Sequence, residues 1–337
     1  NDLRWTALQA TADTVSVVGI PGLTLSVEDA AVAINLVNGV PTDEDAAGRV
    51  IDFATQSLNV LTGTGSSLDL NMDGDQGELL RLSGDVTIAI DNFFHVSGSM
   101  AFERSRADVT LADTNTTTVE ALTIGGTGLN AFIGLNGPYR SADGSTNADA
   151  KGFAVSDVQF GVALLSETDG SGGFTDRQWT AAKASVGTID GIVGLPQLIE
   201  ITPSDLSLEV NLKSGSDNSI VDFSATTFDL VTGTGTNLTL DMDGSLGELV
   251  RAAGDFVISF GGVLRASGSV GFERSTRTLT LADGTTTASA EVLSFGGDDL
   301  RLFVGANAGD PDQIGLEVED VNLAVALAFS NETSGVA

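Results

Sequence analysis

The residues best suited to chemistry are oxygen-bearing side chains gathered in one short segment of the first half of the chain. Alternate residues of this segment point to one side of an expected strand, which then turns at Gly74. Carboxylate and amide oxygens are the ligands that Ca²⁺ prefers in proteins. We therefore predict a calcium site, and calcium as the cofactor, at five residues: Asp69, Asn71, Asp73, Asp75 and Glu78.

Two further segments offer similar ligands. A second copy of the first segment keeps three oxygen donors, Asp241, Asp243 and Glu248, and a separate Gly-containing loop supplies Asp143, Asn147 and Asp149. The first segment resembles half of an EF-hand loop, but its twelfth position is Leu80 and no flanking helices are expected. The alternative interpretation is a set of Asp-Gly turns with solvated polar faces.

Catalytic residue types have little support, so we expect no enzyme. The chain has no cysteine, and its single histidine, His95, corresponds to Arg265 in the second half of the chain. A cysteine nucleophile is thus excluded, and a histidine-based triad fits only one half. Paired glycosidase carboxylates remain an alternative, although Glu103 and Glu273 each lie beside an arginine and are expected to form cross-strand ion pairs.

The net charge limits the classes of partner. The chain carries 15 Lys and Arg against 46 Asp and Glu, a net charge of −31. Such a surface repels phosphate backbones and anionic lipid headgroups, so we expect no nucleic-acid partner. No apolar run reaches the roughly 18 residues needed to span a bilayer, so membrane insertion is not expected either. Cations are the first ligands to test.

An internal repeat of about 170 residues organises the whole chain. Trp5-Thr6-Ala7 returns as Trp179-Thr180-Ala181, and the order of the later matches is collinear. The clearest of these are Met72-Asp73-Gly74 with Met242-Asp243-Gly244, and Phe102-Glu103-Arg104-Ser105 with Phe272-Glu273-Arg274-Ser275. We therefore divide the chain into two β repeat units, residues 1–174 and 175–337.

The ends of the chain match the seam between the repeats. Glu332-Thr333-Ser334-Gly335 corresponds to Glu167-Thr168-Asp169-Gly170, which lies just before the second repeat. Joining the last residue to the first residue of another copy would nearly regenerate the internal junction. The sequence thus predicts a head-to-tail polymer or a longer tandem array, with the chain itself as the partner. An ordinary two-domain protein is the alternative.

The elements that position these residues are strands. Apolar and polar residues alternate in segments such as Leu23 to Val27, Val86 to Ile90 and Leu208 to Leu212, a pattern typical of strands with one wet face. Asp-Gly and Gly-Gly pairs supply hairpin turns. We expect an all-β fold of antiparallel meanders, about eight strands per unit, forming two tandem sandwich-like or rolled-sheet repeats. Trp5 and Trp179 are expected to be buried anchors.

Several repeated phrases carry a resemblance to a known class of protein. Phe-Glu-Arg-Ser, Thr-Leu-Ala-Asp, and the stretches at 292–297 and 131–139 resemble units of giant bacterial tandem-repeat surface proteins, described as adhesin-like or structural. The resemblance implies an extracellular or cell-surface location and a filament, stalk or sheath built of packed β repeats. The alternative is a calcium-dependent adhesin module that binds glycan or a cell surface, and an acidic hydrolase ranks third.

Overall fold

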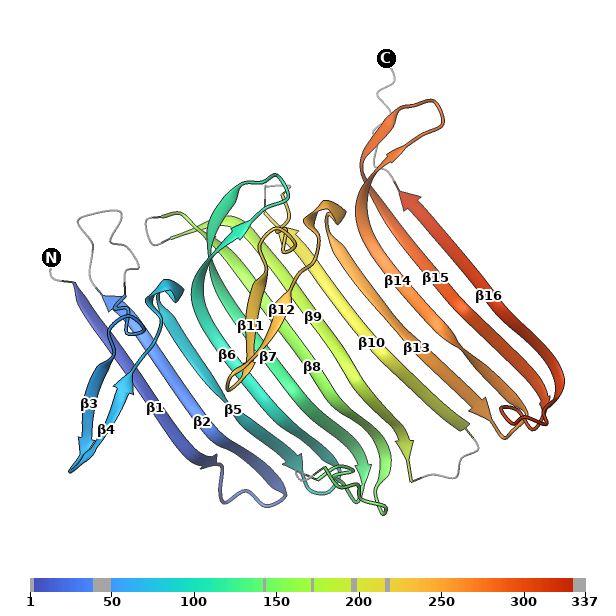
Figure 1. Cartoon of the computed structure of the whole chain (residues 1–337), viewed down its shortest axis with the longest axis horizontal. Coiled ribbons are helices and arrows are strands. Elements are labelled where there is room, and N and C mark those ends of the chain that lie inside the picture. Colours follow the sequence, from blue (N-terminus) through green and yellow to red (C-terminus); the bar gives the residue numbers. More distant parts are fainter. Residues whose placement is uncertain are drawn as a thin grey trace.

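One antiparallel sheet of twelve strands dominates the molecule (Figure 1). The computed structural model describes residues 3–38, 50–141, 144–170, 173–194, 199–215 and 219–329. The strand order in the sheet is β1-β2-β5-β6-β7-β8-β9-β10-β13-β14-β15-β16. The predicted all-β, antiparallel fold class is therefore confirmed.

Eight strands come from each repeat in the described residues. The first eight are β1 (Arg4–Ser16), β2 (Leu23–Asn38), β3 (Leu58–Gly63), β4 (Ser66–Leu70), β5 (Leu79–Ile90), β6 (Phe94–Thr110), β7 (Thr116–Leu135) and β8 (Lys151–Thr168). The second eight are β9 (Phe174–Val193), β10 (Ile199–Ser214), β11 (Phe228–Gly233), β12 (Thr236–Leu240), β13 (Leu249–Phe260), β14 (Leu264–Thr280), β15 (Thr286–Ala306) and β16 (Ile314–Phe329).

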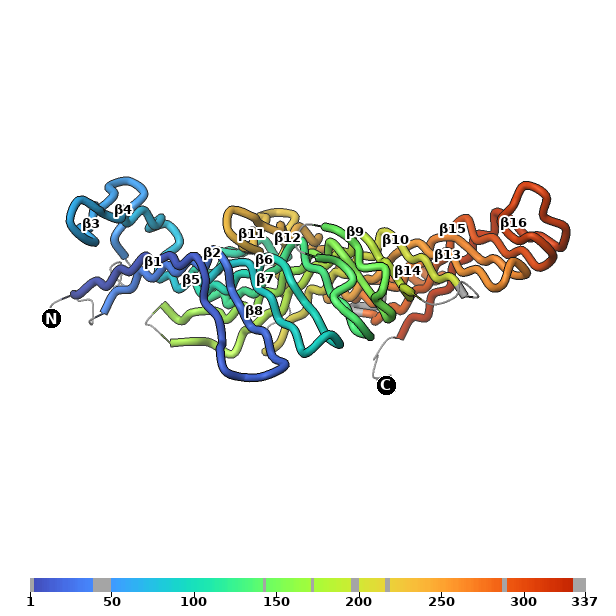
Figure 2. The backbone as a smooth tube through the Cα atoms, turned by 90° about the horizontal axis from the view of Figure 1, so that it is seen from below, coloured from blue at the N-terminus to red at the C-terminus, as the bar shows by residue number. Residues whose placement is uncertain are grey.

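Two hairpins leave the sheet at the same place in each repeat. β3 and β4 pair with each other between β2 and β5, and β11 and β12 pair with each other between β10 and β13. A short 3-10 helix follows each hairpin, η2 (Gly74–Gln76) and η3 (Gly244–Leu246). Both hairpins stand on the same face of the sheet (Figure 2). The second layer of the fold is thus a two-stranded hairpin in each repeat.

Bulges bend the long strands at matching places in the two repeats. The β2–β5 pairing shifts register between Glu28 and Ala31, and the β10–β13 pairing shifts between Ser204 and Ser207. Asp29 and Asp205 lie inside these shifts with φ of 48° and 52°. Aspartate tolerates this left-handed region better than branched or bulky residues do, so it suits the extra residue of a bulge.

The largest core lies beneath the β11–β12 hairpin and draws on both repeats. It includes Val119 and Leu165 from the first repeat and Phe223, Leu230 and Met242 from the second. A smaller core at the base of the β3–β4 hairpin holds Phe53, Leu70, Met72 and Leu79. The counterparts of those four residues, Phe223, Leu240, Met242 and Leu249, all belong to the large core. The additional residues of the large core come from the meeting of the repeats.

Candidate functional site

The junction between the repeats begins with the pairing of β8 and β9. Between these two strands, the Asp169 amide donates to the Gly173 carbonyl at 3.0 Å. The two strands then pair in register, with Ala163 opposite Ala181 and Leu165 opposite Trp179. The boundary predicted between residues 174 and 175 therefore lies at the start of a strand in a continuous sheet.

A platform of small side chains receives the hairpin of the second repeat. Ala101, Gly125 and Gly161 lie side by side on β6, β7 and β8, and the β11–β12 hairpin crosses the junction to cover them (Figure 1). A methyl group added to Gly125 would lie 2.4 Å from the Val231 carbonyl oxygen. One added to Gly161 would lie 2.5 Å from a methyl carbon of Leu230. The close seat of the hairpin therefore requires glycine at both positions.

The segment before the hairpin pairs with the end of β6. Leu111 and Val221 form an antiparallel bridge, flanked by 2.8 Å hydrogen bonds from the Ala112 amide to the Ile220 carbonyl and from the Asp222 amide to the Thr110 carbonyl. Leu111 is 1% exposed and Val221 is fully buried. This second backbone contact joins the repeats on the hairpin side of the sheet.

Polar groups fix the ends of the hairpin. The Lys183 ammonium lies 2.6 Å from a carboxylate oxygen of Asp241 and thereby joins β9 to the segment after β12. Burial raises the pKa of Asp222, but hydrogen bonds from the Ser224 hydroxyl and from the amides of Gly244, Ser224 and Ala225 outweigh burial and hold that pKa below its usual value. Asp222 is therefore a charged acceptor that ties the base of the hairpin together.

Counterparts of the residues that form the internal junction lie at the two outer edges of the sheet, where they are exposed. Trp179 is 2% exposed and its indole N–H donates to the Ser219 carbonyl at 3.2 Å, as expected for a buried anchor. The expectation that Trp5 is buried is wrong, since this side chain is 46% exposed. In the described residues β1 is an edge strand, so no strand lies beside Trp5 where β8 lies beside Trp179.

The second platform is bare in the part of the chain that the structure describes. Gly271, Gly296 and Ala324 on β14, β15 and β16 align as Ala101, Gly125 and Gly161 do. A methyl group added to Gly271 would meet no atom within 4 Å, and one added to Gly296 would meet only the Leu323 carbonyl oxygen, at 3.8 Å. The alternation of apolar and polar residues does not reveal either platform, although small residues at matching positions of the two repeats were a sequence signal for them.

No protein-family model, curated protein or solved structure matched this chain.

The residues predicted to bind calcium in the first repeat make separate contacts within the protein. Asp69 accepts a hydrogen bond from the Asn59 amide at 2.6 Å, and Asp73 accepts one from the Asp75 backbone amide at 2.9 Å. Glu78 accepts from the Val37 amide at 3.3 Å. Asn71 donates through its backbone to Gln9 at 3.3 Å.

The remaining predicted ligands are placed in the same manner. Asp243 accepts from the Ser245 amide at 2.8 Å, and Glu248 accepts from the Lys213 amide at 3.5 Å. The Asn147 side chain donates to the Asn136 carbonyl at 2.7 Å and accepts from the Asp149 amide at 3.0 Å, whereas Asp143 lies outside the described residues. Within the described ranges, no three acidic or histidine side chains form a group suited to a metal ion. Calcium binding stays a prediction.

The expected cross-strand ion pairs are present in both repeats. Glu103 pairs with Arg81 at 2.5 Å, and Glu273 pairs with Arg251 at 2.8 Å. The neighbouring Arg104 pairs in turn with Glu120 on β7 at 2.6 Å. The charged residues of the Phe-Glu-Arg-Ser phrases therefore join adjacent strands through ion pairs.

Burial lowers the pKa of His95, which lies on β6.

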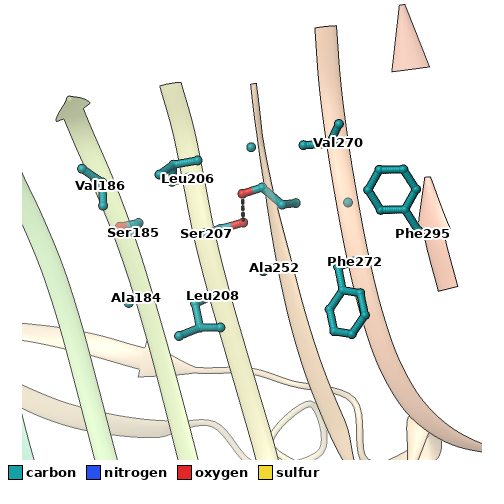
Figure 3. A pocket seen from close by; sticks show the side chains of 13 residues that line it. Ala184, Ser185, Val186, Leu206, Ser207, Leu208, Ala252, Val270, Phe272 and Phe295 are labelled. Carbon is teal, nitrogen blue, oxygen red and sulfur yellow. Dashed lines mark hydrogen bonds between the residues drawn. The ribbon is translucent and has the colours of Figure 1, made fainter. Parts of the chain in front are cut away.

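The face of the sheet opposite the hairpins carries exposed apolar side chains. A shallow depression of about 430 Å³ lies there over β9, β10, β13, β14 and β15 (Figure 3). Leu206, Leu208, Phe272 and Phe295 are among the residues that line it. In the described residues, no helix is long and apolar enough to cross a bilayer.

Proposed function

We propose that this protein is an extracellular structural protein whose β repeats add to one another to build a filament, stalk or sheath. One observation carries the proposal: the seam between repeats is an uninterrupted sheet, and both halves of that seam recur unpaired at the outer edges, within the described residues. A contact between two different surfaces of one molecule does not close on itself and generates an open chain of copies.

Composition supports a role outside the cell. The chain has no cysteine, so its fold does not depend on the redox state of its surroundings. A net charge of −31 keeps a large repeating surface hydrated and discourages unspecific clumping. Long exposed edge strands of a sheet tend to pair unspecifically with strands of other molecules, and soluble proteins normally avoid exposing such strands.

Electron microscopy of the purified chain in negative stain tests the proposal. We expect unbranched filaments with one copy per axial repeat of roughly 55–60 Å, because twelve strands lie about 4.8 Å apart. A sample that stays a uniform monomer at high concentration, in the presence of salt and divalent cations, would overturn the proposal.

A further inference from the structure

The exposed parts at the two ends of the sheet match the buried parts of the internal junction. Leu281 at the end of β14 is 49% exposed, whereas its counterpart Leu111 is 1% exposed. Ile51, the counterpart of buried Val221, is also exposed. The two residues that form the internal bridge therefore each have an exposed equivalent, and these equivalents lie at opposite ends of the molecule.

The β3–β4 hairpin also lacks the seat that its counterpart has. Leu230 and Thr232 on β11 are fully buried over the first platform. The equivalent residues on β3, Val60 and Thr62, are exposed. In Figure 2 the β3–β4 hairpin stands above the sheet at the β1 end, whereas β11–β12 stands over the middle of the sheet.

We infer that a second copy of this chain docks at the β16 edge, with its β1 paired to β16 and its β3–β4 hairpin seated on the platform of Gly271, Gly296 and Ala324. This inference rests on the proposed function and specifies its contact surface. The internal register, Ala163 opposite Ala181 and Leu165 opposite Trp179, sets the register between copies. Ala326 then lies opposite Ala7 of the second copy, and Ala328 lies opposite its Trp5.

The side chains of the two junctions differ in a compensating way. At the internal junction Leu230 sits on Gly161, and a methyl group on that glycine would lie 2.5 Å from a Leu230 methyl carbon. At the outer edges the platform residue is Ala324, one methyl group larger, and the hairpin residue is Val60, one methylene smaller than leucine. The sum of the two volumes is conserved, as close packing of a shared contact requires.

The bridge before the hairpin extends the contact. By equivalence with Leu111 and Val221, Leu281 of one copy pairs with Ile51 of the next. The Ala282 amide donates to the Val50 carbonyl, and the Asp52 amide donates to the Thr280 carbonyl. The docking thereby covers Trp5, Ile51, Val60 and Leu281, four apolar side chains that are exposed to water in the isolated chain.

Disulfide crosslinking tests the register directly, because the chain has no cysteine of its own. We would mix Ala7→Cys with Ala326→Cys, and separately Leu8→Cys with Val325→Cys, then add oxidised glutathione. Adjacent register positions alternate between hydrogen-bonded and non-hydrogen-bonded pairs, so one of the two mixtures has the geometry that suits a disulfide. We expect a covalent dimer in that mixture.

The matched control is Ala7→Cys mixed with Ala324→Cys, which lies on the same face but two residues out of register. We expect at least about tenfold less dimer, because diagonal neighbours lie roughly 7–8 Å apart. β1 and β16 are at opposite edges of the twelve-stranded sheet, so one chain cannot crosslink to itself through these positions. Equal yields in the in-register and out-of-register mixtures would overturn the inference.

A blocking variant tests the platform. Gly296→Leu fills space that is open in the isolated chain, so we expect an unchanged melting temperature and a loss of assembly of about tenfold or more. Leu208→Phe, which enlarges an exposed side chain on the opposite face of β10, away from both edges of the sheet, is the control and should assemble as the wild type does. Full assembly of Gly296→Leu would remove the hairpin seat from the inference.

The inference and the proposed function fail in different ways. Filaments that form without the in-register crosslink would mean that the filament proposal holds and the docking surface is wrong. A specific crosslink in a sample that never extends beyond short oligomers would mean that the docking surface is right and the filament proposal is wrong. Absence of both would overturn both.

Discussion

Single residues decide how firmly the base of each hairpin is held. Asp52 and Asp222 occupy equivalent positions and accept backbone hydrogen bonds from Gly74 and Gly244 respectively. A hydrogen bond from Thr55, followed by one from the Gly74 amide, lowers the pKa of Asp52. In each repeat an ionised carboxylate thus ties the segment before the hairpin to the 3-10 helix after it.

Removing the charge at Asp222 makes this contribution visible. We expect Asp222→Asn to unfold more readily than the wild type at pH 7, by about 1–3 kcal/mol, because the amide accepts the same hydrogen bonds less strongly. The folded-state pKa is depressed, so the stabilising effect is complete above the ordinary value of 3.8 and is lost as pH falls through the folded-state pKa. Urea unfolding at pH 7 and below pH 3.8 measures it; a difference that persists unchanged at low pH would contradict the assignment.

Calcium binding is the other prediction at the residue scale. If the oxygen ligands around Asp73 and Asp243 hold calcium, a free concentration 100 times the Kd stabilises the fold by about 2.7 kcal/mol. The melting temperature should then rise in calcium and fall in chelator. Magnesium at the same concentration controls for simple screening of the negative charge. Identical melting curves in chelator and calcium would remove calcium from the account.

At the scale of elements, the second repeat's hairpin completes the core of the first. We expect Leu230→Ala to destabilise the isolated chain by about 2–5 kcal/mol, because Leu230 is fully buried over the platform. Val60→Ala is the matched control at the equivalent place on β3; it should cost less than about 1 kcal/mol under conditions that prevent assembly. Chemical denaturation of both variants measures the difference, and similar losses would contradict the exposure of the β3–β4 hairpin.

The sequence alone predicts strands well and neighbours poorly. Alternation in Leu23 to Val27 and in Leu208 to Leu212 correctly identifies β2 and β10, because each side of a strand meets a different environment. The alternation pattern does not predict that β11 crosses to the preceding repeat, because the crossing depends on which surface of the sheet has space for the hairpin. The room comes from Gly125 and Gly161, and glycine carries no hydropathy signal. The exposure of Trp5 was not predicted for the same reason: it depends on which strand lies beside β1, and the sequence pattern does not identify that strand.

At the scale of the whole molecule, charge opposes the addition of copies. Each copy carries a net charge of −31, and like charges on neighbouring copies repel over the Debye length, about 30 Å at 0.01 M salt and about 8 Å at 0.15 M. We expect little assembly at low ionic strength and longer filaments at physiological salt. Light scattering across a salt series measures this. Assembly that weakens as salt rises would show that attraction between charges, and not apolar contact, holds the copies together.

The hairpin that reaches over the neighbouring repeat would also give the proposed filament a direction. One end of such a fibre presents a projecting hairpin with no platform under it, and the other end presents a platform with no hairpin on it. The two ends are chemically different, so subunits add to them at different rates, and a molecule that binds one end leaves the other free to grow. The proposed filament would therefore be polar along its axis, because the contact that builds it repeats the one-way crossing of β11–β12 over β6, β7 and β8.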